Sequence, residues 1–165
     1  MANGSCPAGA AGCLGDIGTH AFNLVHYLTD LELEEVCAEL TSFVKGRRLD
    51  DDANVLLRYR GGSRAVLISS QVCLGKENAL TIRIYGTKGS LEWDQEAPNQ
   101  GFIEAFANIY REAARAIRAE VNGDTIPTDC DFPTIDDGVN GMAFVEAAMA
   151  SAKAGGAWTR MATRS

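Results

Sequence analysis

The spacing of apolar and polar positions predicts an opening helix over residues 12–28. At about 100° per residue, the apolar positions share one sector of this helix: Ile17, Ala21, Leu24, Val25 and Leu28. A separate arc of about 60° carries polar side chains: Asp16, His20, Asn23 and Tyr27. The apolar sector can pack against a core, which leaves a carboxylate and an imidazole one turn apart on a face that can line a cleft. Asp16 and His20 are therefore the candidate residues for chemistry.

After this helix the pattern alternates with a period of two, which predicts β-strands. The expected strands cover residues 35–45, 55–60, 64–74 and 79–85, with a return strand through Leu91 and Trp93. Gly61-Gly62-Ser63 and Gly86-Thr87-Lys88-Gly89 are typical hairpin turns, so the strands on either side of each should pair antiparallel. Residues 65–74 carry no charge on either face, and we expect this strand to be central and covered on both sides.

Helical spacing returns from Phe102 to Val121 and stops at Asn122-Gly123, which predicts a second helix. A third helix follows, capped by Thr134 or Asp136, and ends near Gly155-Gly156. The tail can add one short strand at Trp158.

This order of elements predicts an α+β fold with helices on one face of a largely antiparallel sheet. Because the strand over residues 65–74 is apolar on both faces, we expect a partner subunit to cover the other face in a homo-oligomer. Residues 1–11 are rich in small residues and predict a flexible lead-in, and residues 12–165 form one domain.

The composition is that of an ordinary globular protein, with 46% hydrophobic and 22% charged residues among 165. The net charge of −7 disfavours binding to nucleic acid or to an anionic membrane surface. No apolar run is long enough for a transmembrane helix. Five scattered cysteines without a C-x-x-C motif favour a reducing, cytoplasmic setting over a disulfide framework.

Each candidate residue also has a structural interpretation. Asp16 can be a helix N-cap, and His20 can be a structural histidine. His26 lies outside the polar arc, so we interpret it as structural. No third clustered ligand accompanies Asp16 and His20, which argues against a metal site. Glycines 12, 15 and 18 follow no strand, so they indicate a helix entry with close backbone approach rather than a phosphate-binding loop.

The segment from Gly12 to His20 resembles the G-x-x-x-D-x-G-x-H signature that opens the C-terminal domain of the Gfo/Idh/MocA family of NAD(P)-dependent oxidoreductases. The resemblance continues through residues 80–93, which are similar to the hairpin of that domain, and residues 101–108, which are similar to the start of its long helix. Residues 134–138 resemble the start of the last helix. The resemblance covers nearly the whole chain, from about residue 10 to 160.

The resemblance implies a parent enzyme in which a Rossmann domain binds NAD or NADP and this domain supplies most of the substrate pocket and the oligomer interface. It implies that His20 either takes part in proton transfer from a substrate hydroxyl or positions that hydroxyl, and that Asp16 binds substrate and orients the histidine. The substrate would be a sugar, polyol or similar secondary alcohol. An alternative is a non-catalytic binding or assembly module that keeps the fold without a nucleotide-binding domain.

Two departures from the family pattern qualify this expectation. The sequence contains neither a G-x-G-x-x-G motif nor the E-K-P-like motif with the catalytic lysine, so we expect this chain alone to be inactive and to bind no dinucleotide tightly. In addition, residues 93–99 and Gly101 abut where similar proteins carry a loop of a few tens of residues. A natural deletion, an engineered cut or an unrepresented mobile loop would each explain this junction.

Overall fold

The computed structural model describes residues 11–76, 78–95 and 102–162. The chain divides into two compact units, of which the first comprises residues 1–95 and 139–165 and the second residues 96–138. Apart from Ala11, which is buried, the predicted lead-in over residues 1–11 lies outside the described residues, as does most of the junction before Gly101.

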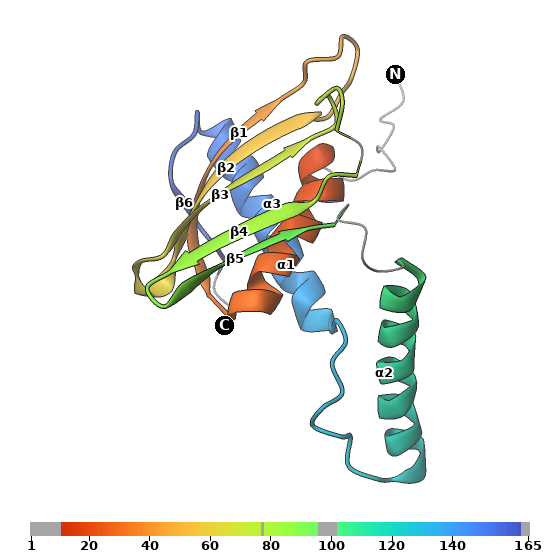
Figure 1. The fold of residues 1–165 in the computed structure, drawn as a ribbon. Helices are drawn as coiled ribbons and strands as arrows, with labels where there is room; N and C mark the ends of the chain where they lie inside the picture. The colour runs from red at the N-terminus through yellow and green to blue at the C-terminus, as the bar shows by residue number, and fades with distance from the viewer. Residues whose placement is uncertain (1–10, 77, 96–101, 163–165) are drawn as a thin grey trace. The chain divides into compact units, whose positions relative to one another are not determined.

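The first unit is built on a four-stranded antiparallel sheet with the strand order β3-β2-β1-β6 (Figure 1). Its strands are β1 (Leu33–Thr41), β2 (Asp52–Tyr59), β3 (Arg64–Ser70) and β6 (Thr159–Arg160). A separate two-stranded antiparallel sheet consists of β4 (Thr81–Gly86) and β5 (Gly89–Asp94). Both predicted hairpins are therefore confirmed, and a short strand does follow Trp158.

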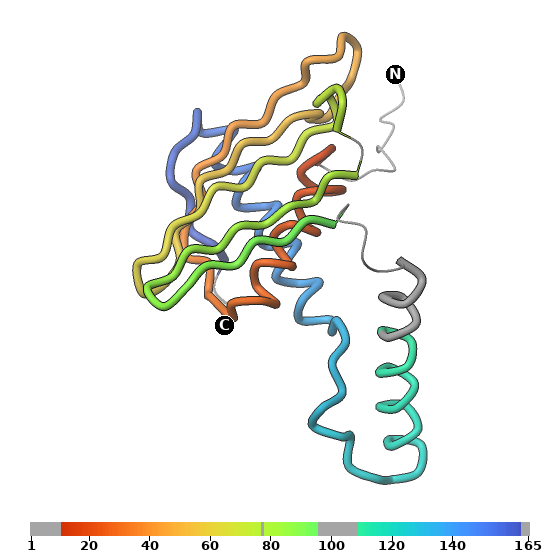
Figure 2. Tube along the Cα trace, viewed as in Figure 1, coloured from red at the N-terminus to blue at the C-terminus, as the bar shows by residue number. Residues whose placement is uncertain are grey.

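Two helical segments lie on the same side of the four-stranded sheet, as the chain trace in Figure 2 shows. The first begins with a π-helical turn, η1 (Leu14–Gly18), and continues as α1 (Thr19–Thr29). The other is α3 (Ile135–Lys153). Thr134 directly precedes α3, and its backbone N–H and its hydroxyl both donate to the Asp137 carboxylate, at 2.7 and 2.8 Å, which is the half of a capping box that the third helical residue supplies.

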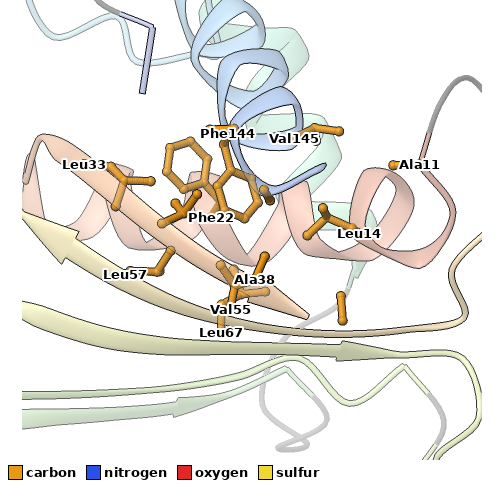
Figure 3. Close-up of a cluster of buried hydrophobic side chains, with 14 of the residues drawn as sticks. Ala11, Leu14, Phe22, Leu33, Ala38, Val55, Leu57, Leu67, Phe144 and Val145 are labelled. Carbon is orange, nitrogen blue, oxygen red and sulfur yellow. The ribbon is translucent and has the colours of Figure 1, made fainter. Parts of the chain in front are cut away.

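The core forms between these helices and the inward face of the sheet (Figure 3). Phe22 of α1 and Phe144 of α3 stack with their ring centroids 4.6 Å apart. Alternate strand residues complete the cluster, among them Val36, Val55 and Leu67. The predicted α+β class, with helices on one face of an antiparallel sheet, is confirmed.

The prediction that the strand over residues 65–74 is central is wrong for the described chain, whereas cover of its outer face by a partner subunit stays a prediction. β3 is an edge strand of the four-stranded sheet and ends at Ser70. Leu67 faces the core, whereas Val66 and Ile68 are each 65% exposed on the opposite face. An uncharged strand can thus have one apolar face turned away from its own core, which sequence alternation alone does not reveal.

The second unit contains α2 (Phe102–Asn122), which confirms the predicted helix. The helix ends where Gly123 adopts a positive φ of 76°, a conformation that glycine reaches without steric cost. Arg115 of α2 pairs with Glu112 on the same helix and makes two hydrogen bonds to the carboxylate of Asp129, at 2.8 and 3.0 Å. Among the helices of the described residues, none is long and apolar enough to cross a bilayer.

Candidate functional site

Asp16 and His20 lie on consecutive helical segments at the start of the first unit. Asp16 belongs to the π-helical turn η1, and His20 belongs to the first turn of α1. The backbone N–H of Thr19 donates to the carbonyl of Leu14, five residues earlier, which is the hydrogen bond that defines a π turn. The sequence predicted a regular α-helix here, so the widened turn is a local departure from that prediction. Turns of this kind are frequent at functional sites.

Both side chains are exposed, as the amphipathic pattern predicts. Tyr27 on the same polar arc is also exposed, at 69%, while Phe22 is buried against the sheet. Within the described part of the chain, the imidazole of His20 has no hydrogen-bond partner, and the structure shows no hydrogen bond between it and Asp16. The imidazole is therefore free to accept a proton from a bound molecule or to donate one to it.

The start of this helical segment is held by a residue that is distant in sequence, Asp50. One oxygen of its carboxylate accepts a hydrogen bond from the Gly12 N–H at 2.6 Å, and the other accepts one from the Leu14 N–H at 2.9 Å. The second oxygen also accepts from the Cys13 thiol at 3.3 Å, and the Asp50 carbonyl accepts from the Cys13 N–H at 2.9 Å. Asp50 thus satisfies backbone donors that the helix itself leaves unpaired.

This arrangement also assigns a role to the glycines. A Cβ on Gly12 would lie 2.0 Å from the Asp50 carbonyl oxygen, and a Cβ on Gly18 would lie 3.0 Å from a Leu14 methyl and 3.3 Å from the Ser69 hydroxyl. The glycines therefore allow the helix entry to pack closely against the loop before β2 and the end of β3. Because Asp50 already occupies the terminal N–H groups, this helix N-terminus does not fit a dinucleotide phosphate.

Asp16 does not cap the helix, because Asp50 does. The Asp16 backbone N–H donates to the Gly12 carbonyl at 3.1 Å, and its carboxylate accepts a hydrogen bond from the Gln71 side chain at 3.4 Å. The interpretation of Asp16 as a helix N-cap is therefore wrong. Its carboxylate is left available on the exposed side of the helix.

The other notable side chains near this segment have structural environments. Burial and the hydrogen bond to Asp50 raise the pKa of the Cys13 thiol to about 12, so this cysteine is an inert thiol at neutral pH. The Nδ1 atom of His26 lies 3.4 Å from the Leu31 carbonyl oxygen at the end of α1, in keeping with the structural role expected of it. Among the described residues, no cluster of three or more potential metal ligands occurs.

Sequence reasoning missed two residues that shape this site. Asp50 reads as one of three consecutive aspartates in a charged connector, and Gln71 reads as part of an uncharged strand. The connector returns to the helix start only through the antiparallel pairing of β1 with β2, which is a tertiary feature. The sequence carries no signal that distinguishes Asp50 from Asp51 or Asp52 as the capping residue.

Comparisons with known proteins identify the family to which this chain belongs. The GFO/IDH/MocA C-terminal domain profile matches residues 5–92, and the chain belongs to this family. The oxidoreductase YfiI of Bacillus subtilis, whose function is uncharacterised, is 28% identical over 190 residues, which take in 92% of this chain and 48% of that protein. The aligned length exceeds that of this chain, so YfiI carries residues that have no counterpart here.

Solved structures agree with this assignment. An oxidoreductase from Sinorhizobium meliloti is 42% identical with a TM-score of 0.85, covering 89% of this chain and 51% of that one. An inositol dehydrogenase homologue from Azotobacter vinelandii, in complex with NADH and myo-inositol, is 28% identical with a TM-score of 0.85, covering 93% of this chain and 51% of that one. This chain therefore spans about half the length of the relatives it matches.

Proposed function

We propose that this chain is the substrate-binding and oligomerisation domain of an NAD(P)-dependent dehydrogenase that acts on a sugar, polyol or similar secondary alcohol. The observation that carries the proposal is the exposed pair of Asp16 and His20 on a helical segment whose start is fixed by Asp50. Family membership and the inositol dehydrogenase homologue with bound NADH and myo-inositol support the reaction class and the polyol substrate.

The proposed chemistry requires a base for a hydroxyl proton. In the parent enzyme, NAD(P) held by a dinucleotide-binding domain supplies the hydride acceptor. The imidazole of His20 accepts the proton of the substrate hydroxyl, and imidazole is suited to this task because its ordinary pKa lies near neutrality. The Asp16 carboxylate accepts hydrogen bonds from substrate hydroxyls and orients the polyol. Reduction of the corresponding ketone uses the same groups in reverse.

The exposure of both residues indicates where the remaining walls of the site belong. Hydride transfer sites exclude water, yet neither Asp16 nor His20 is covered by the described part of this chain. We therefore assign the cover, the dinucleotide and the catalytic lysine to the nucleotide-binding domain of the parent enzyme. On this proposal the chain by itself does not turn over substrate.

The two histidines of the chain provide a matched test in a parent polypeptide that includes a dinucleotide-binding domain. Replacement His20→Ala should lower kcat with NAD⁺ and a polyol by about 10²- to 10⁴-fold, the usual contribution of a general base. Its melting temperature should stay the same, because the side chain is exposed. The control His26→Ala should leave kcat within about threefold, since it touches no group assigned to chemistry. Full turnover in His20→Ala would remove His20 from the mechanism.

The alternative, a non-catalytic assembly module, makes a different prediction for the parent. It predicts that replacing Asp16 or His20 changes no turnover of the parent, while assembly is kept.

A thermal shift measurement on the 165-residue chain with NADH tests where the dinucleotide binds. A true ligand raises the free energy of unfolding by RT ln(1 + [L]/Kd). We expect no saturable stabilisation by NADH, because the proposal assigns the dinucleotide to another domain. Clear stabilisation would contradict the assignment of the dinucleotide to another domain.

We also propose that the outer face of the four-stranded sheet is the oligomer interface. Leu56, Val66 and Ile68 project from it and are 46%, 65% and 65% exposed. The paired residues Leu56 and Val66 lie side by side on adjacent strands, so the apolar area is continuous across β2 and β3. Light scattering of Val66→Lys should give a smaller oligomer than the unsubstituted protein. The control Leu74→Lys, at a fully exposed position outside the strands, should leave the mass unchanged. A monomer in the unsubstituted protein would contradict the proposal.

A further inference from the structure

The Asp16 carboxylate is linked to the segment that follows β3 by one side chain, that of Gln71. Its Nε2 atom donates to Asp16 Oδ2 at 3.4 Å, across 55 residues of sequence. Gln71 lies directly after β3, and its backbone N–H donates to the Asp51 carbonyl at 2.8 Å. Its main chain is therefore held in place independently of the contact with Asp16.

The orientation of the Gln71 amide is determined by its second partner. Arg47 Nη1 donates to Gln71 Oε1 at 3.0 Å. A guanidinium can only donate and an ionised carboxylate can only accept, so only one of the two amide orientations satisfies both neighbours. That orientation directs the NH₂ group of Gln71 towards Asp16. A reversed amide would place donor against donor at Arg47 and oxygen against oxygen at Asp16.

Arg47 is in turn anchored to a buried group. Its Nη1 atom lies 3.7 Å from Oδ2 of Asp51, a carboxylate with no exposed surface. Asp51 accepts hydrogen bonds from the backbone N–H groups of Phe43 and Val44, at 2.8 and 3.0 Å. These bonds keep the pKa of Asp51 below its usual range, with the Phe43 contact as the largest cause. A fixed negative charge therefore holds the guanidinium that orients the Gln71 amide.

We propose that Gln71, oriented by Arg47, is a positioning residue for the Asp16 carboxylate in the dehydrogenase reaction. This inference rests on the proposed function of Asp16. The side chains of Arg47, Gln71 and Asp16 are exposed, and exposed polar pairs contribute little to folding stability. The two possible roles of Gln71 can therefore be separated. A positioning role alters the kinetics without altering the melting temperature, whereas a role in holding the fold lowers the melting temperature.

The test uses the parent polypeptide with its dinucleotide-binding domain, NAD⁺ and a polyol. Gln71→Glu keeps the shape of the side chain but removes the NH₂ donor and sets a second carboxylate against Asp16. Gln71→Leu removes both hydrogen bonds. Each should raise the KM for the polyol about tenfold, corresponding to about 1.4 kcal/mol, while the KM for NAD⁺ and the melting temperature stay constant. Gln95→Glu adds the same charge at another exposed glutamine and should leave the kinetics unchanged.

A double-mutant cycle identifies the contact itself. In the Gln71→Glu background, Asp16→Asn should cost less than it does alone, because the new amide can donate to the new carboxylate. The inference would be overturned if the effects of the two substitutions on the KM for the polyol simply multiplied, or if the Gln71 variants had the same KM as Gln95→Glu. In either case the proposed function stands, provided that Asp16→Asn alone is impaired. Full turnover in Asp16→Asn alone would overturn both the role proposed for Asp16 and the positioning role of Gln71.

Discussion

The clamp formed by Asp50 on the first helical segment yields a quantitative prediction. Replacement Asp50→Ala leaves the N–H groups of Gly12 and Leu14 without their acceptor, while the thiol of Cys13 keeps its contact with the Ser69 carbonyl at 3.4 Å. Leu14 is fully buried, whereas Asp50 is partly exposed, so the lost hydrogen bond is a partly buried one. An unsatisfied buried donor costs about 1–3 kcal/mol, and loss of a helix N-cap costs about 0.5–2 kcal/mol.

These two effects describe the same lost interactions and overlap, so we expect a loss of about 2–3 kcal/mol in the free energy of unfolding. For a chain of this length, that loss lowers the melting temperature by about 5–10 °C. Asp50→Asn should give a smaller loss of about 1–2 kcal/mol, because one oxygen remains while the amide nitrogen faces a backbone donor. The free energy is measured by urea unfolding, and the melting temperature by circular dichroism.

The control is Asp52→Ala, which removes an equal charge two residues later. Asp52 bonds the exposed side chain of Asn54 at 2.7 Å, and its loss should cost no more than about 0.5 kcal/mol. Equal stabilities of Asp50→Ala and Asp52→Ala would refute the role of the clamp. Alkylation of Cys13 in Asp50→Ala as slow as in the unsubstituted protein would also refute it. That result would show that Cys13 stays buried without the Asp50 carboxylate.

Three further predictions concern the core, the pH dependence of stability and the thiol. Phe144→Ala should cost about 3–5 kcal/mol by urea unfolding, because it removes the ring stacked on Phe22; a loss below 1 kcal/mol would contradict the packing. Asp51 has a lowered pKa in the folded state, chiefly through the Phe43 N–H, so its contribution to stability is present above the ordinary Asp pKa of about 3.9 and is lost as the pH falls below it. The urea midpoint should therefore fall as the pH is lowered below about 4, and less steeply in Asp51→Asn; equal slopes would refute the assignment. Cys13, with a pKa of about 12 against an ordinary value of 9.0, has a thiolate fraction about 1,000-fold lower near neutral pH, so peptide mapping after mild alkylation should find it labelled last.

The sequence by itself determined the local elements and one face of each. Alternation and turn residues located the strands of both hairpins, because a period of two and glycine-rich turns are local properties. Helical spacing located α2 and the polar arc that carries Asp16 and His20, because side-chain direction in a helix follows from position alone. The resemblance of residues 12–20 to the family signature also indicated the family that the comparisons confirm.

Only the tertiary structure decided which strand lies at the edge and which distant residues complete the site. The composition of residues 65–74 is the same whether β3 is central or at an edge, since strand order depends on pairing between distant segments. Asp50 lies 34 residues after Asp16 in the sequence and Gln71 lies 55 residues after it, yet both contact the start of the first helical segment. No local periodicity records such contacts, because they arise when the antiparallel sheet brings the end of β3 and the loop before β2 to the same place. The sequence therefore supplied the two candidate groups for chemistry, and the fold supplied the residues that hold them.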